Sequence, residues 1–521
     1  MRILGISGMF HDASATMIQD GKILFAGHAE RYSREKNDPY INKQLMQEAC
    51  QYGLPDVIVL HESSKLKNNR RMKQLSWSSI KAAITEPSME DWLQSYYPQL
   101  KGIPVTNCLH HQSHAAAGLM TAPQDWTSAT IVTIDAIGEK QTATISSWSK
   151  NEKVLLRHET NFPNSLGLFY SAVTSAVGLK PMEDEYILMG MAAYGKPVYK
   201  DKIEKELFKT ELTFSRNGQM TTDNLHTCLE TVDMSKGLPK GFMSEEALQD
   251  KQIQFDLAAS AQAVAEERIF AYCKLAFIYY PTPNLVFMGG VALNCVANSK
   301  LYDIYKNIWI MPNPGDAGSS LGAAALYYFE STGNRMEWET PFLGTNIEGE
   351  WPTNKFLESL RKGAIFGVAN GRAEFGPRAL GNRSLFADAR GPNIQDKVNK
   401  IKRRQEFRPF APIVLEEFAR DWFEMPGGKI NSPYMSFVAK CIQPDVIPAV
   451  VHKDGTSRVQ TVNRKQHPEL YHAMRQWHAE TGCPVVLNTS LNIKGQPIVN
   501  TEQEADDFAK HYKVKVHCRD D

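Results

Sequence analysis

The stretch GRAEFGPRALGNRSLFADARGPNIQDKVNKIKRRQEFRPFAP, residues 371–412, indicates the fold and the chemistry of the C-terminal half of this chain. The dipeptides Gly-Pro at 376–377 and Gly-Asn at 381–382 are turn signals, and the planar fork of arginine matches phosphate and carboxylate oxygens. A solvated basic surface is the alternative, but interleaved hydrophobic residues such as Phe386 have little use there. The stretch therefore predicts a pocket for a phosphorylated ligand. Among its cations are Arg372, Arg378, Arg383, Arg390, Lys402, Arg403, Arg404 and Arg408.

Composition sets the outer limits. With 521 residues and 42% hydrophobic content, the chain can bury large cores, and its length suggests two to three domains. Its net charge is zero, so no overall basic field points to nucleic acid as a partner. The eight cysteines are scattered without a CxxC pair, which is typical of a reduced protein. The opening MRILGISGMF is too short for a signal peptide, and no apolar run reaches membrane-spanning length. We therefore expect a cytoplasmic protein with no membrane partner.

Two similar strand patterns predict a duplicated first domain. Residues 2–7, 15–19 and 22–26 are apolar runs around a polar turn at 8–12. The pattern returns at residues 129–134 and 142–148, again with an acidic turn between the runs. Helical periodicity fits residues 42–52, 80–83, 257–278 and 319–329, and its mixture with short strands indicates α/β structure.

The periodic pattern is lost between residues 329 and 352, where Gly, Pro and polar residues collect. We place a domain boundary there, after residue 345. Beyond it, strands are expected at 363–369, 413–415, 449–451 and 484–488, with a helix at 468–481. Strands that carry ligands at their ends suit a second, compact α/β domain.

A candidate metal site lies in the first domain. His110 and His114 are four residues apart, so they project from one face of a predicted helix. Asp135 follows the predicted strand 129–134, and Asp316 precedes a helix of small residues. Either aspartate could instead be a helix cap or a turn former. Two His and two Asp together suit Fe(II), Mn(II) or Zn(II) better than Mg(II) or Ca(II).

Glycine-rich turns accompany this candidate site. The sequence MGGVALN, which contains Gly289, Gly290 and Asn294, follows the apolar run 285–287. The sequence PNPGDAGSSLGAA around Asp316 opens a helix whose N-terminal amides could face an anion. Each turn alone is weak, since Gly-Gly after a strand is often only a tight turn, but together they predict a nucleotide-binding cleft.

These motifs, over nearly the whole chain, resemble the O-carbamoyltransferase family of the nodulation, cephamycin and tobramycin enzymes (the NodU/CmcH/TobZ type). The resemblance implies an actin-like (ASKHA, TsaD-like) duplicated α/β domain at 1–345, followed by a YrdC-like α/β domain at 346–521. It implies that the metal ligands, which are also the expected catalytic residues, are His110, His114, Asp135 and Asp316, with Fe(II) favoured over Mn(II) or Zn(II). Gly289, Gly290 and Asn294 would then bind nucleotide.

Transfer of a carbamoyl group to an alcohol needs an activated donor, because carbamate has no adequate leaving group. The resemblance implies that the C-terminal domain makes carbamoyl adenylate from carbamoyl phosphate and ATP. The first domain would then pass the carbamoyl group to a hydroxyl of a small molecule, sugar or nucleoside, with the metal as Lewis acid. The residues expected to bind the donor are Arg378, Lys402, Arg404, Arg458, Asn488 and Ser490.

The chain departs from the family pattern in one segment. It has NTSLNIKGQPIV where family members usually have NTSFN and a GEPIV-like stretch, so Leu491 and Gln496 are changed. Two other functions fit the same folds: a threonylcarbamoyl-type transferase acting on tRNA, and a non-enzymatic actin-like ATP-binding protein. The neutral net charge disfavours the first, and the complete His and Asp set disfavours the second. The sequence leaves the oligomeric state open, and a homodimer is compatible with the general frequency of such assemblies.

Overall fold

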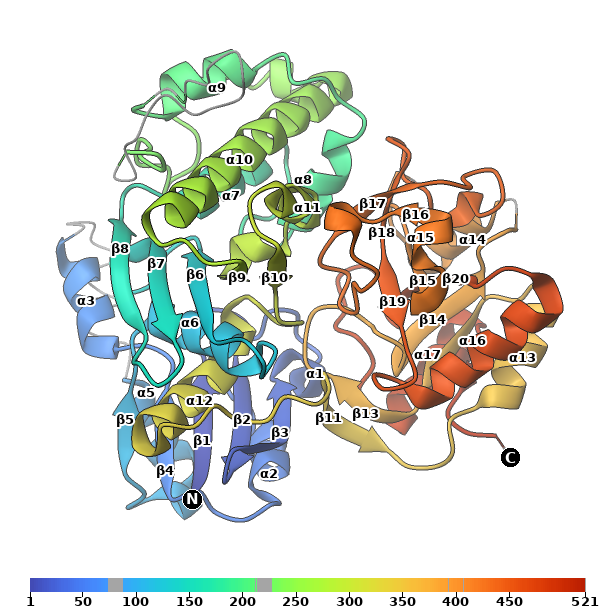
Figure 1. Cartoon of the computed structure of the whole chain (residues 1–521), viewed down its shortest axis with the longest axis horizontal. Coiled ribbons are helices and arrows are strands. Elements are labelled where there is room, and N and C mark those ends of the chain that lie inside the picture. Colours follow the sequence, from blue (N-terminus) through green and yellow to red (C-terminus); the bar gives the residue numbers. More distant parts are fainter. Residues whose placement is uncertain (74–87, 211, 213–226, 392, 406, 521) are drawn as a thin grey trace. The chain divides into compact units, whose positions relative to one another are not determined.

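The computed structural model describes residues 1–73, 88–210, 212, 227–391, 393–405 and 407–520. Contacts divide the chain into two compact units. The first consists of residues 1–26 and 39–338, and the second of residues 27–38 and 339–521. The boundary predicted after residue 345 thus falls inside the second unit, and residues 27–38 pack with the C-terminal half. The predicted mixed α/β structure is confirmed in both units (Figure 1).

The first unit contains two sheets of the same topology. One has the order β3-β2-β1-β4-β5 and the other β8-β7-β6-β9-β10. In each, an antiparallel pair, β1 with β2 or β6 with β7, is followed by a parallel neighbour, β4 or β9. The predicted repeat is therefore present in the sheets. The strands are Arg2–Ser7, Ser14–Gln19, Lys22–His28, Val57–Leu60 and Val105–Asn107 for β1 to β5, and Ser128–Ile134, Gln141–Ser149, Leu155–Asn161, Asn284–Met288 and Asn307–Trp309 for β6 to β10.

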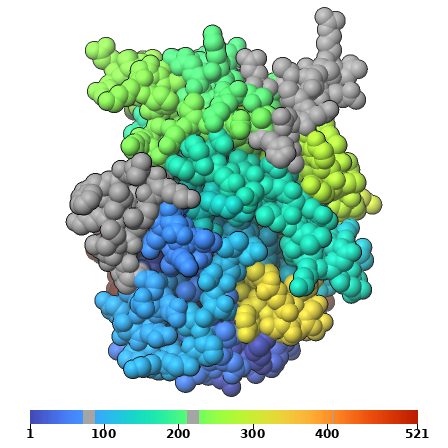
Figure 2. Space-filling view, turned by 90° about the vertical axis from the view of Figure 1, so that its left-hand side faces the viewer, coloured from blue at the N-terminus to red at the C-terminus, as the bar shows by residue number. Residues whose placement is uncertain are grey.

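Two helices of small residues, α6 (His110–Thr121) and α12 (Ser319–Thr332), pack against each other in this unit, and α12 also packs on β1 and β2. Their closeness has a simple cause: a Cβ on Gly322 of α12 would lie 1.8 Å from the carbonyl oxygen of Ser113. The surface coloured yellow in Figure 2, near the end of α12, accordingly lies beside cyan and blue segments.

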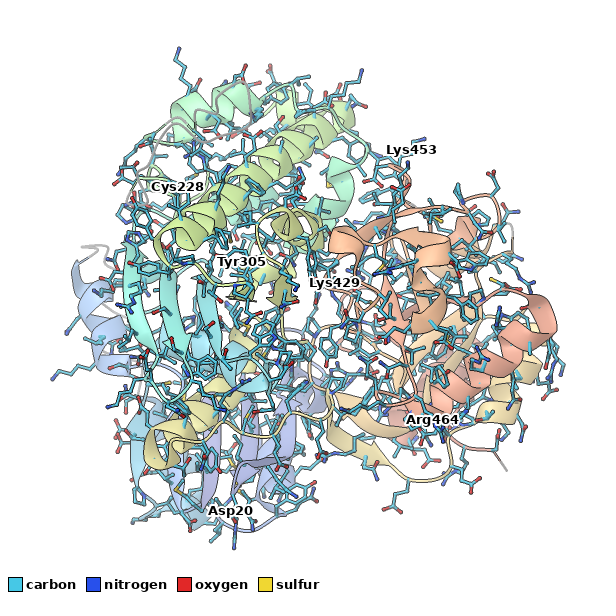
Figure 3. All side chains as sticks on the ribbon, viewed as in Figure 1. Asp20, Cys228, Tyr305, Lys429, Lys453 and Arg464 are labelled. Atoms are coloured by element: carbon cyan, nitrogen blue, oxygen red, sulfur yellow. The ribbon has the colours of Figure 1, made fainter. Side chains whose placement is uncertain are left out.

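The long helix α10 (Lys251–Tyr279) packs with α7 (Leu166–Ala176), α8 (Glu185–Ala192) and α9 (Lys200–Leu207). Tyr305 donates a hydrogen bond of 3.1 Å to the carbonyl of Cys273 in α10, and Cys228 also contacts this helix (Figure 3). The other helices of the unit are α2 (Lys43–Cys50), α3 (Ser64–Lys73), α5 (Met89–Tyr96) and α11 (Cys295–Lys300), with short 3-10 turns η1 (Pro98–Leu100), η2 (Ala247–Gln249), η3 (Gly290–Leu293), η4 (Leu301–Asp303) and η5 (Asp316–Gly318).

The second unit is built on a sheet of order β19-β15-β20-β14-β12-β21, covered by helices on both faces. Alternate residues of its strands face opposite cores: Phe386 and Val486 pack with one cluster, and Ala387 and Leu487 with the other. The strands are β12 (Phe366–Ala369), β14 (Arg383–Asp388), β15 (Ala411–Leu415), β19 (Gln460–Val462), β20 (Val485–Ser490) and β21 (Val516–His517).

Smaller elements complete this unit. The helices are α1 (Glu30–Ser33), α13 (Thr353–Arg361), α14 (Ile394–Ile401), α15 (Ala419–Trp422), α16 (Pro468–Thr481) and α17 (Glu502–Tyr512). The small sheets consist of β11 (Phe342–Ile347) with β13 (Gly371–Glu374), and of β16 (Phe423–Glu424), β17 (Val438–Cys441) and β18 (Thr456–Arg458). The 3-10 turns are η6 (Glu416–Phe418), η7 (Pro426–Gly428) and η8 (Pro448–Val450).

One predicted strand is wrong. Residues 449–451 were expected to be extended, but Pro448 begins the 3-10 turn η8, in which Val450 N donates to Ile447 O at 3.2 Å. Proline fixes φ near its helical value and lacks an N–H, so it favours the start of such a turn over a ladder. The helix predicted at 80–83 lies outside the described residues.

Candidate metal centre and donor site

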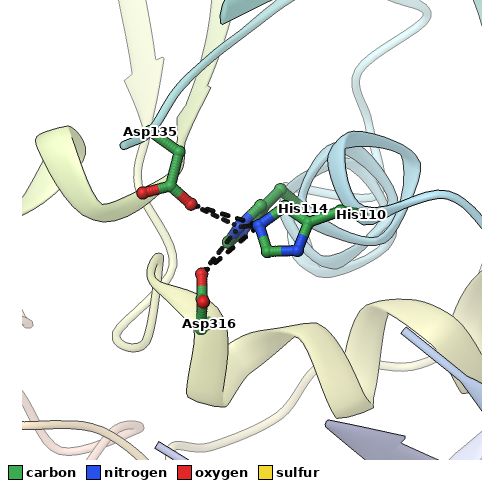
Figure 4. Close-up of side chains that lie close together, drawn as sticks. All are labelled: His110, His114, Asp135 and Asp316. Atoms are coloured by element: carbon green, nitrogen blue, oxygen red, sulfur yellow. Dashed lines mark hydrogen bonds and ion pairs between the residues drawn. The ribbon is translucent and has the colours of Figure 1, made fainter. Parts of the chain in front are cut away.

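The predicted His and Asp residues come together in the first unit (Figure 4). His110 and His114 lie one turn apart on α6, Asp135 follows β6, and Asp316 begins the turn η5 before α12. One ligand atom from each lies within 4.8 Å of all the others. All four side chains are buried, with His114 at 0% exposure and both aspartates at 8%.

The ligand atoms point at one another. Nε2 of His110 and Nε2 of His114 are 3.1 Å apart. Oδ2 of Asp135 lies 3.3 Å and 3.0 Å from these nitrogens, and Oδ1 of Asp316 lies 3.4 Å and 3.3 Å from them. Convergence of two imidazoles and two carboxylates in a buried place fits a divalent ion of the Fe, Mn or Zn type, and the donor set suits such an ion better than it suits Mg(II).

Backbone groups orient the two ends of this cluster. Oδ1 of Asp135 accepts hydrogen bonds from Ala136 N at 2.8 Å and from Gly290 N at 3.3 Å, which leaves Oδ2 facing the histidines. The carboxylate of Glu139 accepts from His110 N at the start of α6. Gly289 has φ +90°, and a Cβ there would lie 2.2 Å from Ile134 O, so the glycine turn packs directly under the end of β6.

The closeness of the imidazoles and carboxyls shifts the pKa values of all four side chains. Burial alone would lower the pKa values of the imidazoles of His110 and His114, but the two carboxyls raise both. Burial alone would raise the pKa values of the two carboxyls, but the imidazoles hold both below their usual value. Metal binding here would therefore displace protons from the imidazoles.

Neighbouring histidines differ in role. His111 is buried, but its Nδ1 lies 3.2 Å from Thr144 Oγ1, and burial lowers its pKa to about 3. It is not one of the four residues whose ligand atoms converge. His11 was not assigned a role from the sequence, yet its Nε2 lies 3.5 Å from Asp316 Oδ2 and its Nδ1 2.9 Å from Asp12 Oδ2. The feature of the sequence that could have indicated this role is the His11-Asp12 pair, which lies in a turn after the buried strand β1.

The third residue expected to bind nucleotide, Asn294, lies in a side-chain network. Its Nδ2 donates to Gln262 Oε1 at 3.0 Å, and its Oδ1 accepts from Ala297 N at 3.2 Å at the start of α11. Tyr170 donates to the same oxygen of Gln262 at 2.7 Å. Asn294 therefore links the glycine turn to α10.

In the second unit, the structure places Lys402 against Ser490. Nζ of Lys402 donates to the carbonyl oxygen of Ser490 at 2.5 Å and to that of Asn492 at 2.9 Å, and it lies 3.2 Å from Ser490 Oγ. Lys402 is 3% exposed. Asn488, on the same strand as Ser490, donates to Ala379 O at 3.0 Å and so adjoins the loop of Arg378. Asn492 contacts Lys402 through its carbonyl and its side chain and was not predicted from the sequence.

The remaining cations of the basic stretch have different surroundings. Arg404 donates to Asn399 Oδ1 at 2.7 Å and stacks over Phe410, and Arg458 lies on β18 opposite Val438. Arg383 is fully buried and donates to backbone carbonyls, among them Asn500 O at 3.0 Å. Arg383 therefore has a structural role. The spacing of arginines in a sequence does not distinguish this role from phosphate binding.

Leu491, which stands where family members usually have Phe, is a core residue. Its side chain is 0% exposed, in a core with Leu385 and Phe508. Gln496 is exposed, and its carbonyl accepts from Asn492 Nδ2 at 2.7 Å.

None of the described helices has the length and apolar character needed to cross a membrane.

Comparison with known proteins matches both halves of the chain. Residues 2–325 match the model described as carbamoyltransferase N-terminus, and residues 357–520 the model described as carbamoyltransferase C-terminus. An uncharacterized Synechocystis protein is 34% identical over 96% of this chain and 93% of its own length. Nodulation protein NolNO of Sinorhizobium fredii is 30% identical over 95% of this chain and 76% of its own. The 3'-hydroxymethylcephem-O-carbamoyltransferase of Amycolatopsis lactamdurans is 25% identical over 94% and 93%.

Proposed function

The chain belongs to the carbamoyltransferase family and is an enzyme that transfers a carbamoyl group, and we propose that it is an ATP-dependent O-carbamoyltransferase with two separate sites. The observation that carries the proposal is the buried convergence of His110, His114, Asp135 and Asp316 in the unit that matches the family's N-terminal model. A relative named for carbamoyl transfer to a hydroxymethyl group supports a hydroxyl acceptor. Family membership also removes the non-enzymatic alternative.

The second unit is the proposed donor site, of the YrdC-like type. Lys402 and Ser490 are in contact there, and Asn488 lies two residues before Ser490 on β20. Water would release phosphate from carbamoyl phosphate, and a carbamate oxygen would then bond to the α-phosphorus of ATP as pyrophosphate leaves. The ammonium of Lys402 and the guanidinium groups of Arg378, Arg404 and Arg458 would bind the phosphate oxygens during these steps.

The first unit is the proposed transfer site, of the actin-like, TsaD-like type. His110, His114, Asp135 and Asp316 would hold a divalent metal, Fe(II) or else Mn(II) or Zn(II), which supplies Lewis acidity when bound. The glycine turn at Gly289 and Gly290 would bind the adenylate portion of the donor. The acceptor's hydroxyl oxygen would bond to the carbamoyl carbon as the bond to AMP breaks and the hydroxyl loses its proton.

Separate variants of the two sites test this proposal. The purified protein is incubated with ATP, carbamoyl phosphate and Fe(II) or Mn(II), and pyrophosphate and carbamoyl adenylate are followed. We expect Lys402→Ala to abolish adenylate formation, because Lys402 lies in the donor site. His114→Ala should still form adenylate but should fail to transfer the carbamoyl group to an acceptor hydroxyl.

Two neighbouring residues provide matched controls. His111→Ala removes a buried histidine of α6 that contacts Thr144 instead of the cluster, and Lys400→Ala removes an exposed lysine two residues from Lys402. Lys400→Ala should retain adenylate formation, and His111→Ala should retain both adenylate formation and carbamoyl transfer. Absence of pyrophosphate from the wild type would contradict the donor site, and transfer to tRNA in an acceptor screen would favour the threonylcarbamoyl-type reaction instead.

A further inference from the structure

A buried carboxylate lies behind the metal cluster, beside the other nitrogen of His110. Glu62 follows β4 and is 6% exposed. Its Oε2 lies 4.0 Å from Nδ1 of His110, within ion-pair distance. This Nδ1 is itself buried, and it has no hydrogen-bond partner among the described residues. The two nitrogens of His110 therefore face carboxylates on opposite edges of the ring: Nε2 faces Asp135 and Asp316, and Nδ1 faces Glu62.

A lysine balances the charge of this carboxylate. Nζ of Lys67, on α3, donates to Oε1 of Glu62 at 2.5 Å, and Lys67 is 7% exposed. Burial alone would raise the pKa of Glu62, but His61 and Lys67 lower it. Lys67 donates its hydrogen bond to Oε1 of Glu62, whereas the oxygen that faces His110 is Oε2. The side chains of Glu62 and Lys67 thus form a buried ion pair, and Oε2 lies 3.9 Å from Nε2 of His61 and 4.0 Å from Nδ1 of His110.

Two roles for Glu62 have to be compared. Ligand atoms of His61, Glu62 and His110 lie within 4.8 Å of one another, as in a second metal site. A metal ion bound there would have to share the carboxylate of Glu62 with the ammonium of Lys67. Two cations on the two oxygens of one buried carboxylate repel each other strongly. A carboxylate behind a ligand histidine fixes the tautomer and orientation of the imidazole. At 4.0 Å the carboxylate of Glu62 is beyond hydrogen-bond distance from Nδ1 of His110, but its negative charge still favours a proton on the nitrogen that faces it.

We propose that Glu62 is a positioning residue: it holds the proton of His110 on Nδ1 and so keeps Nε2 free as a ligand atom, while Lys67 fixes the carboxylate. A neutral imidazole carries one proton, and a ligand nitrogen must be the one without it. This inference rests on the proposed metal site of the first unit. It adds a residue outside the four ligands that sets the affinity of that site.

Binding of Mn(II) alone tests the inference without any turnover. Free and bound Mn(II) are measured by electron paramagnetic resonance for the wild type and Glu62→Gln, and the melting temperature of the metal-free protein is recorded. We expect one bound ion in both and a roughly ten- to hundredfold weaker Kd in the variant. Glu204→Gln is the matched control, since it removes a partly buried carboxylate paired with the buried Arg268, between α9 and α10. Its Kd should equal that of the wild type.

The single variant leaves Lys67 buried without its partner, which could prevent folding. The double variant Glu62→Leu/Lys67→Met removes both charges together and should fold, with the same weaker binding. An unchanged Kd in the folded variants, or an equal loss in Glu204→Gln, would overturn the positioning role. A second Mn(II) ion in the wild type that is lost with Glu62 would also overturn it, in favour of a second metal. A wild type that binds no Mn(II), Fe(II) or Zn(II) would instead contradict the proposed metal site.

Discussion

Lys402 is a buried cation surrounded by oxygen atoms. Its Nζ contacts Ser490 and Asn492 through backbone and side-chain oxygens, so the ammonium form has more acceptors than protons to donate. Burial nevertheless lowers its pKa well below the usual value for lysine, and the nearby cations Arg404 and Arg408 lower it further. An anionic ligand would offset both effects, because a phosphate group stabilises the charged amine.

If carbamoyl phosphate binds at Lys402, as we propose, this effect of charge on the pKa of Lys402 predicts proton uptake on binding. Above the lowered pKa of free Lys402 the amine is neutral, and the bound phosphate raises that pKa, so a proton is taken up. Affinity should therefore fall as the pH rises from this lowered pKa toward the usual value of lysine. Calorimetry in buffers of different ionisation enthalpy measures the uptake.

Lys402→Arg is the informative variant, since guanidinium stays charged over this range. Its binding should show no proton uptake, whereas Lys400→Arg, at an exposed position, should behave as the wild type. Equal uptake in Lys402→Arg and wild type would show that another group takes up the proton.

The residues of the buried His and Asp cluster could largely be predicted from the sequence. Helical periodicity places His110 and His114 on one face, and Asp135 and Asp316 stand where a strand ends and a helix begins. Glu62 could not be predicted to join them, because β4 and α6 meet only through the tertiary fold. Its local sequence, HESSK, is that of an ordinary polar turn.

At the scale of elements, the packing of α6 against α12 brings the histidines and Asp316 together. Gly322 permits this approach, since any Cβ there would overlap the carbonyl of Ser113. Gly322→Ala should push the helices apart. We expect it to lower the free energy of unfolding by about 1–3 kcal/mol through overpacking and to weaken Mn(II) binding.

Gly190→Ala is the control for this change. Gly190 lies in α8, and a Cβ there would meet nothing within 4 Å. Alanine should be neutral or stabilise the protein by about 0.5–1 kcal/mol, because it is the better helix former. Chemical denaturation and metal titration of both variants check the pair, and equal stability of Gly322→Ala and wild type would contradict the packing argument.

Elements with local start and stop signals were predicted best. The helix predicted at 468–481 is confirmed: Pro468 occupies its first turn, His467 caps it, and Gly482 ends it with φ +71°. The expected strand at 449–451 lacked such signals, and its apolar residues Ala449 and Val450 are buried as a 3-10 turn instead. The apolar character of a short segment indicates that it is buried but does not indicate whether its backbone is extended or helical.

At the scale of the whole chain, residues 27–38 belong to the unit formed by the C-terminal half. Arg34 donates to Ile498 O at 2.8 Å and to Pro497 O at 3.0 Å, and it pairs with Glu504 at 3.1 Å. Arg31, 3% exposed, donates to Gly376 O at 3.1 Å. These contacts join positions more than 340 residues apart in sequence, which no local pattern predicts. The second unit therefore depends on an N-terminal segment for part of its structure.

This dependence gives a prediction for Arg34→Met. The variant leaves the carbonyls of Pro497 and Ile498 without their donor, so the second unit should lose about 1–3 kcal/mol of stability. Arg361→Met is the matched control in the same unit: its partner Glu480 is an exposed residue, and such surface pairs contribute about 0–1 kcal/mol. Hydrogen exchange at residues 485–500, followed with urea unfolding, should show faster opening in Arg34→Met than in Arg361→Met. Equal exchange in the two variants would mean that residues 27–38 merely rest on a unit that is stable without them.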